Sequence, residues 1–188
     1  IVNCWVCELP NSIELIGGEN IVVKNCQLGA QPTGITCKVQ EVNKLSFINN
    51  QVYPDGRENL VLDACNNCVI EGNNFKSYYN GILVLNGNDN TVNKNIFWLT
   101  GAVQNQLLDH GDDFGIINVK GNNNMVASNS LSCEWAYAGA VTVNAVQGTG
   151  NVFKNCFVDN LESYRVFLVN AQTEVSNCVS SDKVSIVE

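Results

Sequence analysis

Two carboxylates near the start of the chain have the chemistry of an acid/base pair. Glu14 lies in the segment SIELI, between aliphatic residues, and Glu8 lies six residues before it. If Ile13 and Leu15 point into a core, strand alternation turns the Glu14 side chain outward. A carboxylate that is partly buried in a groove has a raised pKa and can exchange protons with a substrate. A solvated strand residue is the alternative interpretation, and the sequence leaves it open.

An acidic cluster around the only histidine is a second candidate site. Asp109, His110, Asp112 and Asp113 fall within five consecutive residues. Imidazole and carboxylate groups can bind a metal ion or transfer protons. The DHGDD spacing is not that of a calcium loop, so no metal is expected. We keep these four residues as candidates for substrate binding, with an exposed acidic loop tip as the alternative.

Several aromatic residues are candidates for stacking on sugar rings. Trp98 and Trp135 lie near the acidic cluster, and Tyr78 and Tyr79 precede an Asn-Gly dipeptide. Because Asn-Gly is typical of a turn, burial of the two tyrosines is less expected there. Ordinary packing in a core is the alternative for all four residues.

The cysteines favour a reduced core over a metal site. Nine cysteines include two CxxC pairs, at 4–7 and 65–68. Four thiolates can bind zinc, but these pairs are separated by 57 residues and lack the glycines of zinc knuckles. We therefore expect small buried thiols, no metal and no other cofactor.

An internal repeat specifies the scaffold that must position these residues. An asparagine follows a short apolar run at positions 25, 49, 73, 95, 129, 155 and 177, mostly at intervals of 22 to 26 residues. A second apolar run begins 11 to 15 residues before each next asparagine, at positions 13, 35, 60, 82, 116, 140 and 166. A unit of strand, turn, strand and turn with asparagine at a fixed corner is typical of a parallel β-helix.

The predicted fold is therefore an all-β, single-stranded, right-handed parallel β-helix of about seven to eight coils. One long interval, from Asn95 to Ile116, contains an insertion near residues 98–114 that includes the acidic cluster. Insertions in solenoids collect on one face, often the binding face. We expect one domain over residues 1–188, and because the chain begins at Ile1 in a strand pattern, a piece of a longer or processed protein.

Composition excludes several functional classes. The formal net charge is −8, with 10 Lys and Arg against 18 Asp and Glu. A nucleic-acid or anionic-membrane partner is therefore not expected, since both need a basic surface. No apolar run approaches the ~18 residues that span a bilayer. Thirty asparagines and 25 valines favour many short strands separated by tight turns.

Three segments resemble the inulin fructotransferases, glycoside hydrolase family 91. They are NNFKSYYNGILVLNG at 73–87, DFGIINVKGNNNMVASN at 113–129 and NCWVCELPNSIEL at 3–15. The likeness covers most of this chain and corresponds to the C-terminal part of a member. It implies a trimer of right-handed β-helices that splits inulin by intramolecular fructosyl transfer, as a lyase releasing a cyclic difructose anhydride.

The resemblance also implies which residues act. The family's catalytic glutamate corresponds to Glu14, whereas its catalytic aspartate falls on Asn3. An amide cannot exchange a proton near neutral pH, so a simple two-carboxylate mechanism is interrupted here. Either Glu8 or an acid from a neighbouring subunit replaces the aspartate, or the protein is inactive, or the alignment is shifted.

Two classes of function therefore stay open. The first is a fructan-cleaving enzyme of the inulin fructotransferase type, located extracellularly. The second is a catalytically inactive β-helix, such as a polysaccharide-binding, phage-spike or surface repeat protein. A fructan or other polysaccharide is the expected partner. Exposed apolar residues Ile16, Leu83, Ile117 and Val141 are predicted on one sheet face, which favours a homotrimer.

Overall fold

The computed structural model describes residues 1–100, 113–134, 140–159, 163 and 165–187. Within these ranges, the strands form three parallel sheets of seven, eight and seven strands. Sheet 1 contains β1 (Trp5–Leu9), β4 (Gln27–Ala30), β7 (Gln51–Val52), β10 (Asn74–Ser77), β13 (Ile96–Leu99), β16 (Ser130–Cys133) and β19 (Phe157–Asp159). Sheet 2 contains β2 (Ile13–Glu19), β5 (Ile35–Asn43), β8 (Glu58–Asp63), β11 (Leu83–Asn86), β14 (Ile117–Val119), β17 (Val143–Ala145), β20 (Phe167–Asn170) and β22 (Val184–Val187).

Sheet 3 completes each coil. It contains β3 (Val22–Lys24), β6 (Ser46–Ile48), β9 (Val69–Glu71), β12 (Thr91–Asn93), β15 (Met125–Ala127), β18 (Val152–Lys154) and β21 (Glu174–Ser176). A single 3₁₀ turn, η1 (Ser181–Lys183), is the helical element of the described residues. No helix in this part of the chain is long and apolar enough to cross a membrane.

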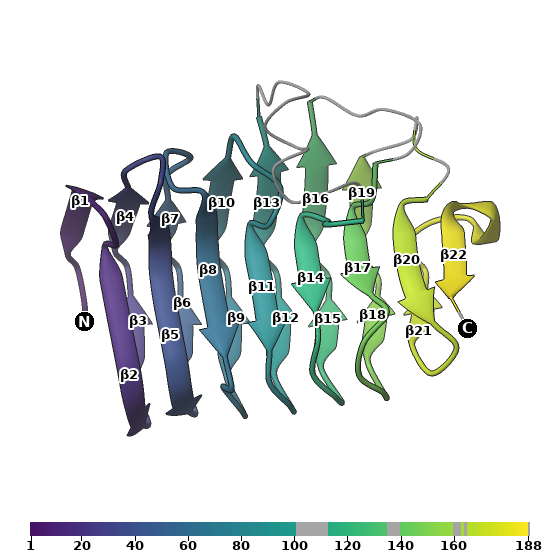
Figure 1. Cartoon of the computed structure of the whole chain (residues 1–188), viewed down its shortest axis with the longest axis horizontal. Coiled ribbons are helices and arrows are strands. Elements are labelled where there is room, and N and C mark those ends of the chain that lie inside the picture. Colours follow the sequence, from purple (N-terminus) through teal and green to yellow (C-terminus); the bar gives the residue numbers. More distant parts are fainter. Residues whose placement is uncertain (101–112, 135–139, 160–162, 164, 188) are drawn as a thin grey trace.

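The prediction of a parallel β-helix is confirmed. Each strand pairs in parallel with the strand of the same sheet one coil later, as in Leu83 with Ile117. In Figure 1 the chain descends along sheet 2 at the front, rises at the back and advances toward the C-terminus, which makes the helix right-handed. Sheet 1 lies at the upper edge of this view.

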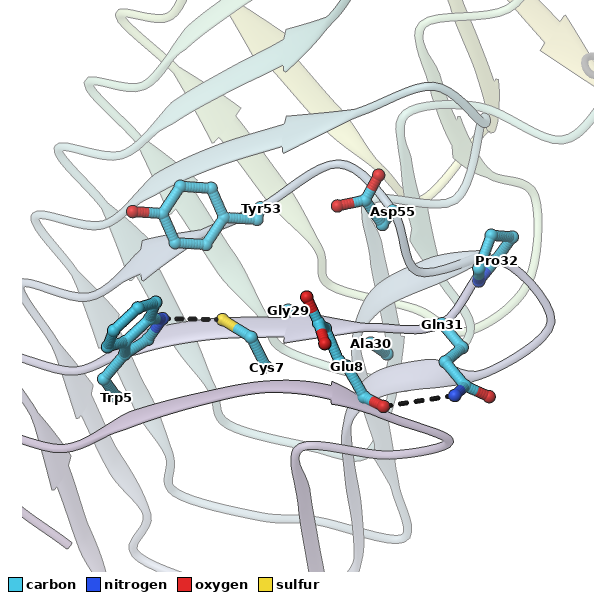
Figure 2. Close-up of a pocket in the computed structure, with 9 residues that line it drawn as sticks. All are labelled: Trp5, Cys7, Glu8, Gly29, Ala30, Gln31, Pro32, Tyr53 and Asp55. Carbon is cyan, nitrogen blue, oxygen red and sulfur yellow. Dashed lines mark hydrogen bonds between the residues drawn. The ribbon is translucent and has the colours of Figure 1, made fainter.

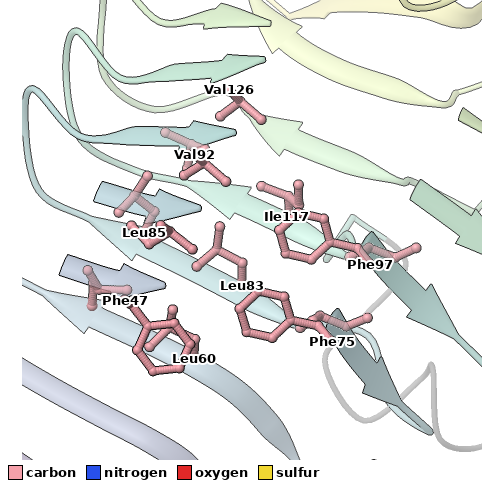
Figure 3. Close-up of a cluster of buried hydrophobic side chains, with 14 of the residues drawn as sticks. Phe47, Leu60, Phe75, Leu83, Leu85, Val92, Phe97, Ile117 and Val126 are labelled. Atoms are coloured by element: carbon pink, nitrogen blue, oxygen red, sulfur yellow. The ribbon is translucent and has the colours of Figure 1, made fainter. Parts of the chain in front are cut away.

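The interior is filled by side chains that repeat from coil to coil. The rings of Phe75 and Phe97 stack with centroids 5.0 Å apart and an interplanar angle of 1°. Phe47 continues the stack on the other side of Phe75, at 6.1 Å. Aliphatic side chains such as Leu60 and Leu83 pack against these rings (Figure 3). The aligned core holds the outer faces of all three sheets in a fixed register.

Two neighbouring positions form the corner between sheets 3 and 1: one turns the backbone and the next points into the interior. The first position has left-handed backbone, with φ of 56° at Asn25 and 54° at Asn49, a conformation that asparagine tolerates well. The second position points inward and forms a ladder of buried amides. For example, Asn73 Nδ2 donates to Asn95 Oδ1 at 2.9 Å.

The repeat read from the sequence combined these two positions. Asn25, Asn49, Asn155 and Asn177 occupy the left-handed position, whereas Asn73, Asn95 and Asn129 lie one residue later, in the ladder. The ladder position is occupied by cysteine in the coils at either end, at Cys4, Cys26, Cys156 and Cys178. A second amide ladder, through Asn90, Asn124 and Asn151, lies at the corner between sheets 2 and 3.

The predicted apolar face of sheet 2 is wrong for three of its four residues. Ile16 is 70% exposed, but Leu83, Ile117 and Val141 are buried. The runs that contain them have apolar residues at both strand parities, so alternation alone does not tell which side chains point inward. These four residues therefore do not form an exposed apolar face on sheet 2 that would favour a trimer.

All nine cysteines are free thiols, and five of them are buried. Within the described residues, no group of three or more His, Cys, Asp or Glu side chains is arranged to hold a metal ion. Burial raises the pKa of the Cys37, Cys65 and Cys68 thiols, for Cys68 to about 11. These side chains belong to the core, as the sequence suggested.

The raised pKa of Cys68 predicts a loss of stability in alkali. The unfolded chain releases the Cys68 proton near the thiol's ordinary pKa, about 9, while the folded chain keeps it up to about 11. Its contribution is therefore complete below pH 9 and is lost as the pH rises through 11. Between pH 8 and pH 11, wild type should lose about 2 kcal/mol more unfolding free energy than Cys68→Ala. Urea unfolding of both proteins checks this, and equal losses would contradict it.

Candidate functional site

An open groove of about 440 Å³ lies on the outer face of sheet 1, at the N-terminal end of the β-helix. Strand β1, strand β4 and the segment after β7 form its walls and floor. It is lined by Trp5, Cys7, Glu8, Gly29, Ala30, Gln31, Pro32, Tyr53 and Asp55. Figure 2 shows two aromatic rings at one end of the groove and two carboxylates toward the other.

A β-bulge turns Glu8 into the groove. Strands β1 and β4 pair in register up to Val6, but Leu9 then pairs with Ala30, so two residues of β1 oppose the single residue Gly29. A bulge of this kind leaves one residue out of the ladder and redirects side chains. Glu8 accordingly has a φ of 64°. The Gln31 side chain fixes the bulge, since its Nε2 donates to the Glu8 carbonyl oxygen at 3.1 Å.

Gly29 keeps the floor of the groove low. A Cβ atom at this position would lie 3.2 Å from Tyr53 Cβ and 3.5 Å from Cys7 Sγ. Any residue larger than glycine would therefore fill the space between the Tyr53 and Cys7 side chains. With glycine there, a ligand can approach the backbone of β4.

The two aromatic rings are exposed and held in place. Trp5 is 79% exposed, and Tyr53 is 38% exposed. Trp5 Nε1 donates to Cys7 Sγ at 3.0 Å, and the Tyr53 hydroxyl donates to Gln27 Oε1 at 3.0 Å. Figure 2 shows the rings one above the other on the same side of the groove. Such fixed amphipathic rings offer apolar faces that suit sugar rings, with little entropy to lose on binding.

Glu8 and Asp55 supply the ionisable groups of the groove. Both residues are exposed and both line the groove, and Figure 2 shows them on the same side of the two aromatic rings. A pair of carboxyl groups on either side of a glycosidic bond can protonate the leaving oxygen and deprotonate the attacking group. The groove therefore combines surfaces for sugar binding with groups for acid/base chemistry.

A third acid lies close to Asp55 along the chain. Burial raises the pKa of the Glu58 carboxyl, and the neighbouring Arg57 opposes that effect. The Arg57 Nε and Glu58 Oε1 atoms are 4.0 Å apart. A carboxyl with a raised pKa stays protonated to higher pH, as a general acid requires. Glu58 does not line the groove, so we give it no role in the chemistry.

The structure does not bring Glu14 or Asn3 into the groove. Glu14 lies on the outer face of sheet 2, where its Oε1 accepts from Lys38 Nζ at 3.1 Å. Asn3 occupies the left-handed corner position, with a φ of 57°, and its Oδ1 accepts from Asn25 Nδ2 at 3.2 Å. Asparagine at position 3 is therefore explained by its structural role, because it adopts the left-handed backbone and bonds to the asparagine of the next coil. Of the three predicted acid/base residues, Glu8 alone lines this groove.

Three of the predicted sugar-binding aromatics, Trp98, Tyr78 and Tyr79, do not line the groove. Trp98 is on the outer face of sheet 1, in β13, with Lys76 Nζ 4.6 Å from its ring centroid. Tyr78 and Tyr79 follow β10, and the Tyr79 amide donates to Ser77 Oγ at 3.0 Å. Neither tyrosine lines the groove.

The acidic cluster is described only at its end. Asp113 is exposed, and its Oδ1 accepts from Arg165 Nη1 at 2.7 Å. Asp109, His110 and Asp112 lie outside the described residues, as does Trp135.

Trp5, Tyr53 and Asp55 were not singled out from the sequence. Trp5 lies in β1, whereas Tyr53 and Asp55 follow β7 about 50 residues later, and only coil stacking places them together. One sequence signal pointed to the two aromatic residues: Trp5 is next to Val6 and Tyr53 is next to Val52, and an apolar strand residue of this kind is expected to point into the core. Strand alternation therefore turns both rings outward.

Known proteins share this architecture. The family model described as periplasmic copper-binding protein (NosD) matches residues 2–175. A solved structure of DFA-IIIase from Arthrobacter chlorophenolicus A6 in complex with GF2 is similar at 20% identity, with a TM-score of 0.79. The match covers 98% of this chain and 49% of that chain. No curated protein matches this chain.

Other structures of the same enzyme give the same result. The C387A mutant in complex with DFA-III is similar at 19% identity, with a TM-score of 0.78, over 98% of this chain and 51% of that chain. The enzyme without its lid matches at 20% identity, with a TM-score of 0.78, over 98% and 48%. This chain thus spans about half the length of these similar structures, and the likeness is one of fold.

Proposed function

This chain belongs to the NosD family, and we propose that it is a carbohydrate-active β-helix whose groove cleaves a fructan by intramolecular fructosyl transfer. One observation carries the proposal. Two exposed, fixed aromatic rings and two carboxylates line the same groove. Sugar rings need the first pair of groups and glycosidic-bond cleavage needs the second.

In the proposed reaction, a carboxylic acid protonates the glycosidic oxygen as its bond to the anomeric carbon breaks. The other carboxylate removes a proton from a hydroxyl of the neighbouring fructosyl unit, whose oxygen then bonds to the same carbon. One carbon–oxygen bond is broken and one is formed, so no water is consumed and a cyclic difructose anhydride is released. Glu8 and Asp55 take these two roles.

The choice of substrate has support from two directions. Three segments of the sequence resemble the inulin fructotransferases, and solved structures of a DFA-IIIase share the fold over 98% of this chain. The name of the NosD family favours a location outside the cytoplasm, where a polysaccharide would be met. A homotrimer is proposed on the sequence resemblance alone, and the sedimentation mass of the protein tests it.

Copper binding, which the NosD name suggests, does not fit the donors of the described residues. Copper in proteins prefers thiolate, thioether and imidazole ligands. The only methionine, Met125, lies in β15 of sheet 3, and the only histidine lies outside the described ranges. Among the residues that the structure describes, His, Cys, Asp and Glu form no cluster of three that could hold a metal. Copper therefore has no role in the proposed reaction.

A non-catalytic polysaccharide-binding protein is the second candidate. One observation favours it: Glu8 and Asp55 are both exposed, so the groove has no buried acid of the kind that glycosidases often use. In that case the groove would bind the sugar chain without cleaving it.

Incubation of the purified protein with inulin separates the two candidates. We expect a cyclic difructose anhydride, identified by chromatography and mass spectrometry, without a stoichiometric release of free fructose. Release of fructose alone would replace transfer by hydrolysis. Binding of inulin without any product would favour the second candidate, and neither binding nor product would contradict both.

A further inference from the structure

The outer face of sheet 1 carries one large aromatic side chain in every second coil. Trp5 lies in β1, Tyr53 directly after β7, Trp98 in β13 and Phe157 in β19, which are the first, third, fifth and seventh strands of the sheet. Three of these rings are well exposed, and Phe157 is 66% exposed. Trp98 is partly exposed, under Lys76.

The alternate strands carry polar groups on the same face. These outward residues are Gln27 in β4, Asn74 and Lys76 in β10, and Ser130 and Ser132 in β16. Their amide, ammonium and hydroxyl groups suit the hydroxyls of a sugar. Asn74 and Lys76 lie midway along this face.

The spacing of the rings follows from the fold. Neighbouring strands lie about 4.8 Å apart, so rings in alternate strands lie about 9.5 Å apart along the axis. Rings at this spacing can contact separate sugar units of one polysaccharide chain. The rings stand in two columns, since Trp5 pairs with Gln27 and Phe157 with Ser130, whereas Trp98 pairs with Ser132. The Tyr53 ring bridges the columns, because its hydroxyl reaches Gln27.

We propose that this face, which we call the aromatic track, binds one neutral linear polysaccharide chain along the axis of the β-helix, with one aromatic contact for every two coils. The track begins at the groove, whose rings Trp5 and Tyr53 are its first two positions. That the bound polysaccharide has its reacting end in the groove rests on the proposed function. A neutral polymer is favoured, because the net charge of −8 repels a polyanion. The track thus assigns a polymer, rather than a short sugar, as the ligand.

Variants far from the groove test the track. Trp98→Ala and Phe157→Ala should each weaken the binding of long-chain inulin about tenfold, and leave the binding of a fructan trisaccharide unchanged. Ile16→Ala is the matched control, since it removes an exposed apolar side chain from sheet 2. Binding is measured by calorimetry, and circular dichroism checks that each variant is folded.

The outcomes separate the track from the groove. Equal affinity of wild type for long-chain inulin and for the trisaccharide would overturn the track, as would polymer binding that both aromatic variants retain. Either result leaves the reaction at the groove intact, because product formation from inulin is measured independently. Conversely, length-dependent binding that is lost in both variants supports the track even if no product forms.

Discussion

Glu8→Gln and Asp55→Asn should each lower the rate of difructose anhydride release from inulin by about 10²–10⁴-fold, the usual contribution of a general acid or base. Each amide keeps the size of the side chain but can neither give nor take a proton near neutral pH. Because both residues are exposed and neither belongs to the core, folding should be unaffected. Initial rates and the Kd for inulin, measured for each variant, separate a loss of chemistry from a loss of binding.

Matched carboxylates elsewhere on the molecule control for the loss of charge. Glu41 is exposed and, like Glu8, has left-handed backbone, with a φ of 54°. Asp89 is its counterpart for Asp55, exposed and remote from the groove. Glu41→Gln and Asp89→Asn should retain the wild-type rate. Full activity in both Glu8→Gln and Asp55→Asn would place the chemistry elsewhere.

The family resemblance supplies the competing site. If Glu14 is the catalytic glutamate, Glu14→Gln abolishes product formation and Asn3→Asp raises it, while the groove variants keep their activity. The structure puts Glu14 beside Lys38 on sheet 2 and Asn3 at a left-handed corner. These two sets of variants therefore assign the reaction to different faces of the β-helix.

The fold was predictable because each coil carries its own short apolar runs and corner asparagine in a contiguous stretch of sequence. Short apolar runs that begin 11 to 15 residues before an asparagine predict strands and corners of similar length in each coil, and the sheets follow once the coils stack. The exact role of each asparagine was less predictable. Asn49 and Asn50 are adjacent, so the sequence does not tell which one turns the backbone and which one points inward. At the next corner Gly72 turns the backbone and Asn73 is the buried amide.

The candidate site was predictable only in part. Glu8 was singled out as a carboxylate near the chain start. The direction of its side chain depends on a bulge between β1 and β4, and no local sequence pattern predicts that bulge. Tyr53 and Asp55 reach the groove through stacking of the third coil on the first two. Side chains that meet through stacking share no sequence motif, so their association needs the register of all three coils.

The largest effect on stability is expected inside the corner ladder, at Asn95. Its Nδ2 donates to Ile70 O at 2.9 Å and to Asn129 Oδ1 at 3.0 Å, while its Oδ1 accepts from the backbone and side-chain nitrogens of Asn73. Asn95→Ala removes all of these bonds and leaves buried groups unpaired, at about 1–3 kcal/mol each. We expect a total loss of about 4 kcal/mol of unfolding free energy, a large share of the stability of a domain.

The exposed Asn86 provides the control, because its single side-chain bond to Asp63 Oδ1, at 2.7 Å, lies in water. Asn86→Ala should cost under about 1 kcal/mol. Asn95→Cys should fall between the two alanine variants, since cysteine already occupies the same ladder position at Cys26 and Cys178. The Cys26 thiol donates to Lys24 O at 3.3 Å, and Cys178 Sγ accepts from the Cys156 backbone nitrogen at 3.4 Å, so a sulfur replaces part of the amide's bonding. Urea midpoints rank the three variants. If Asn95→Ala is no less stable than Asn86→Ala, the ladder is not what holds the coils in register, and the stacked aromatic and aliphatic core must do so alone.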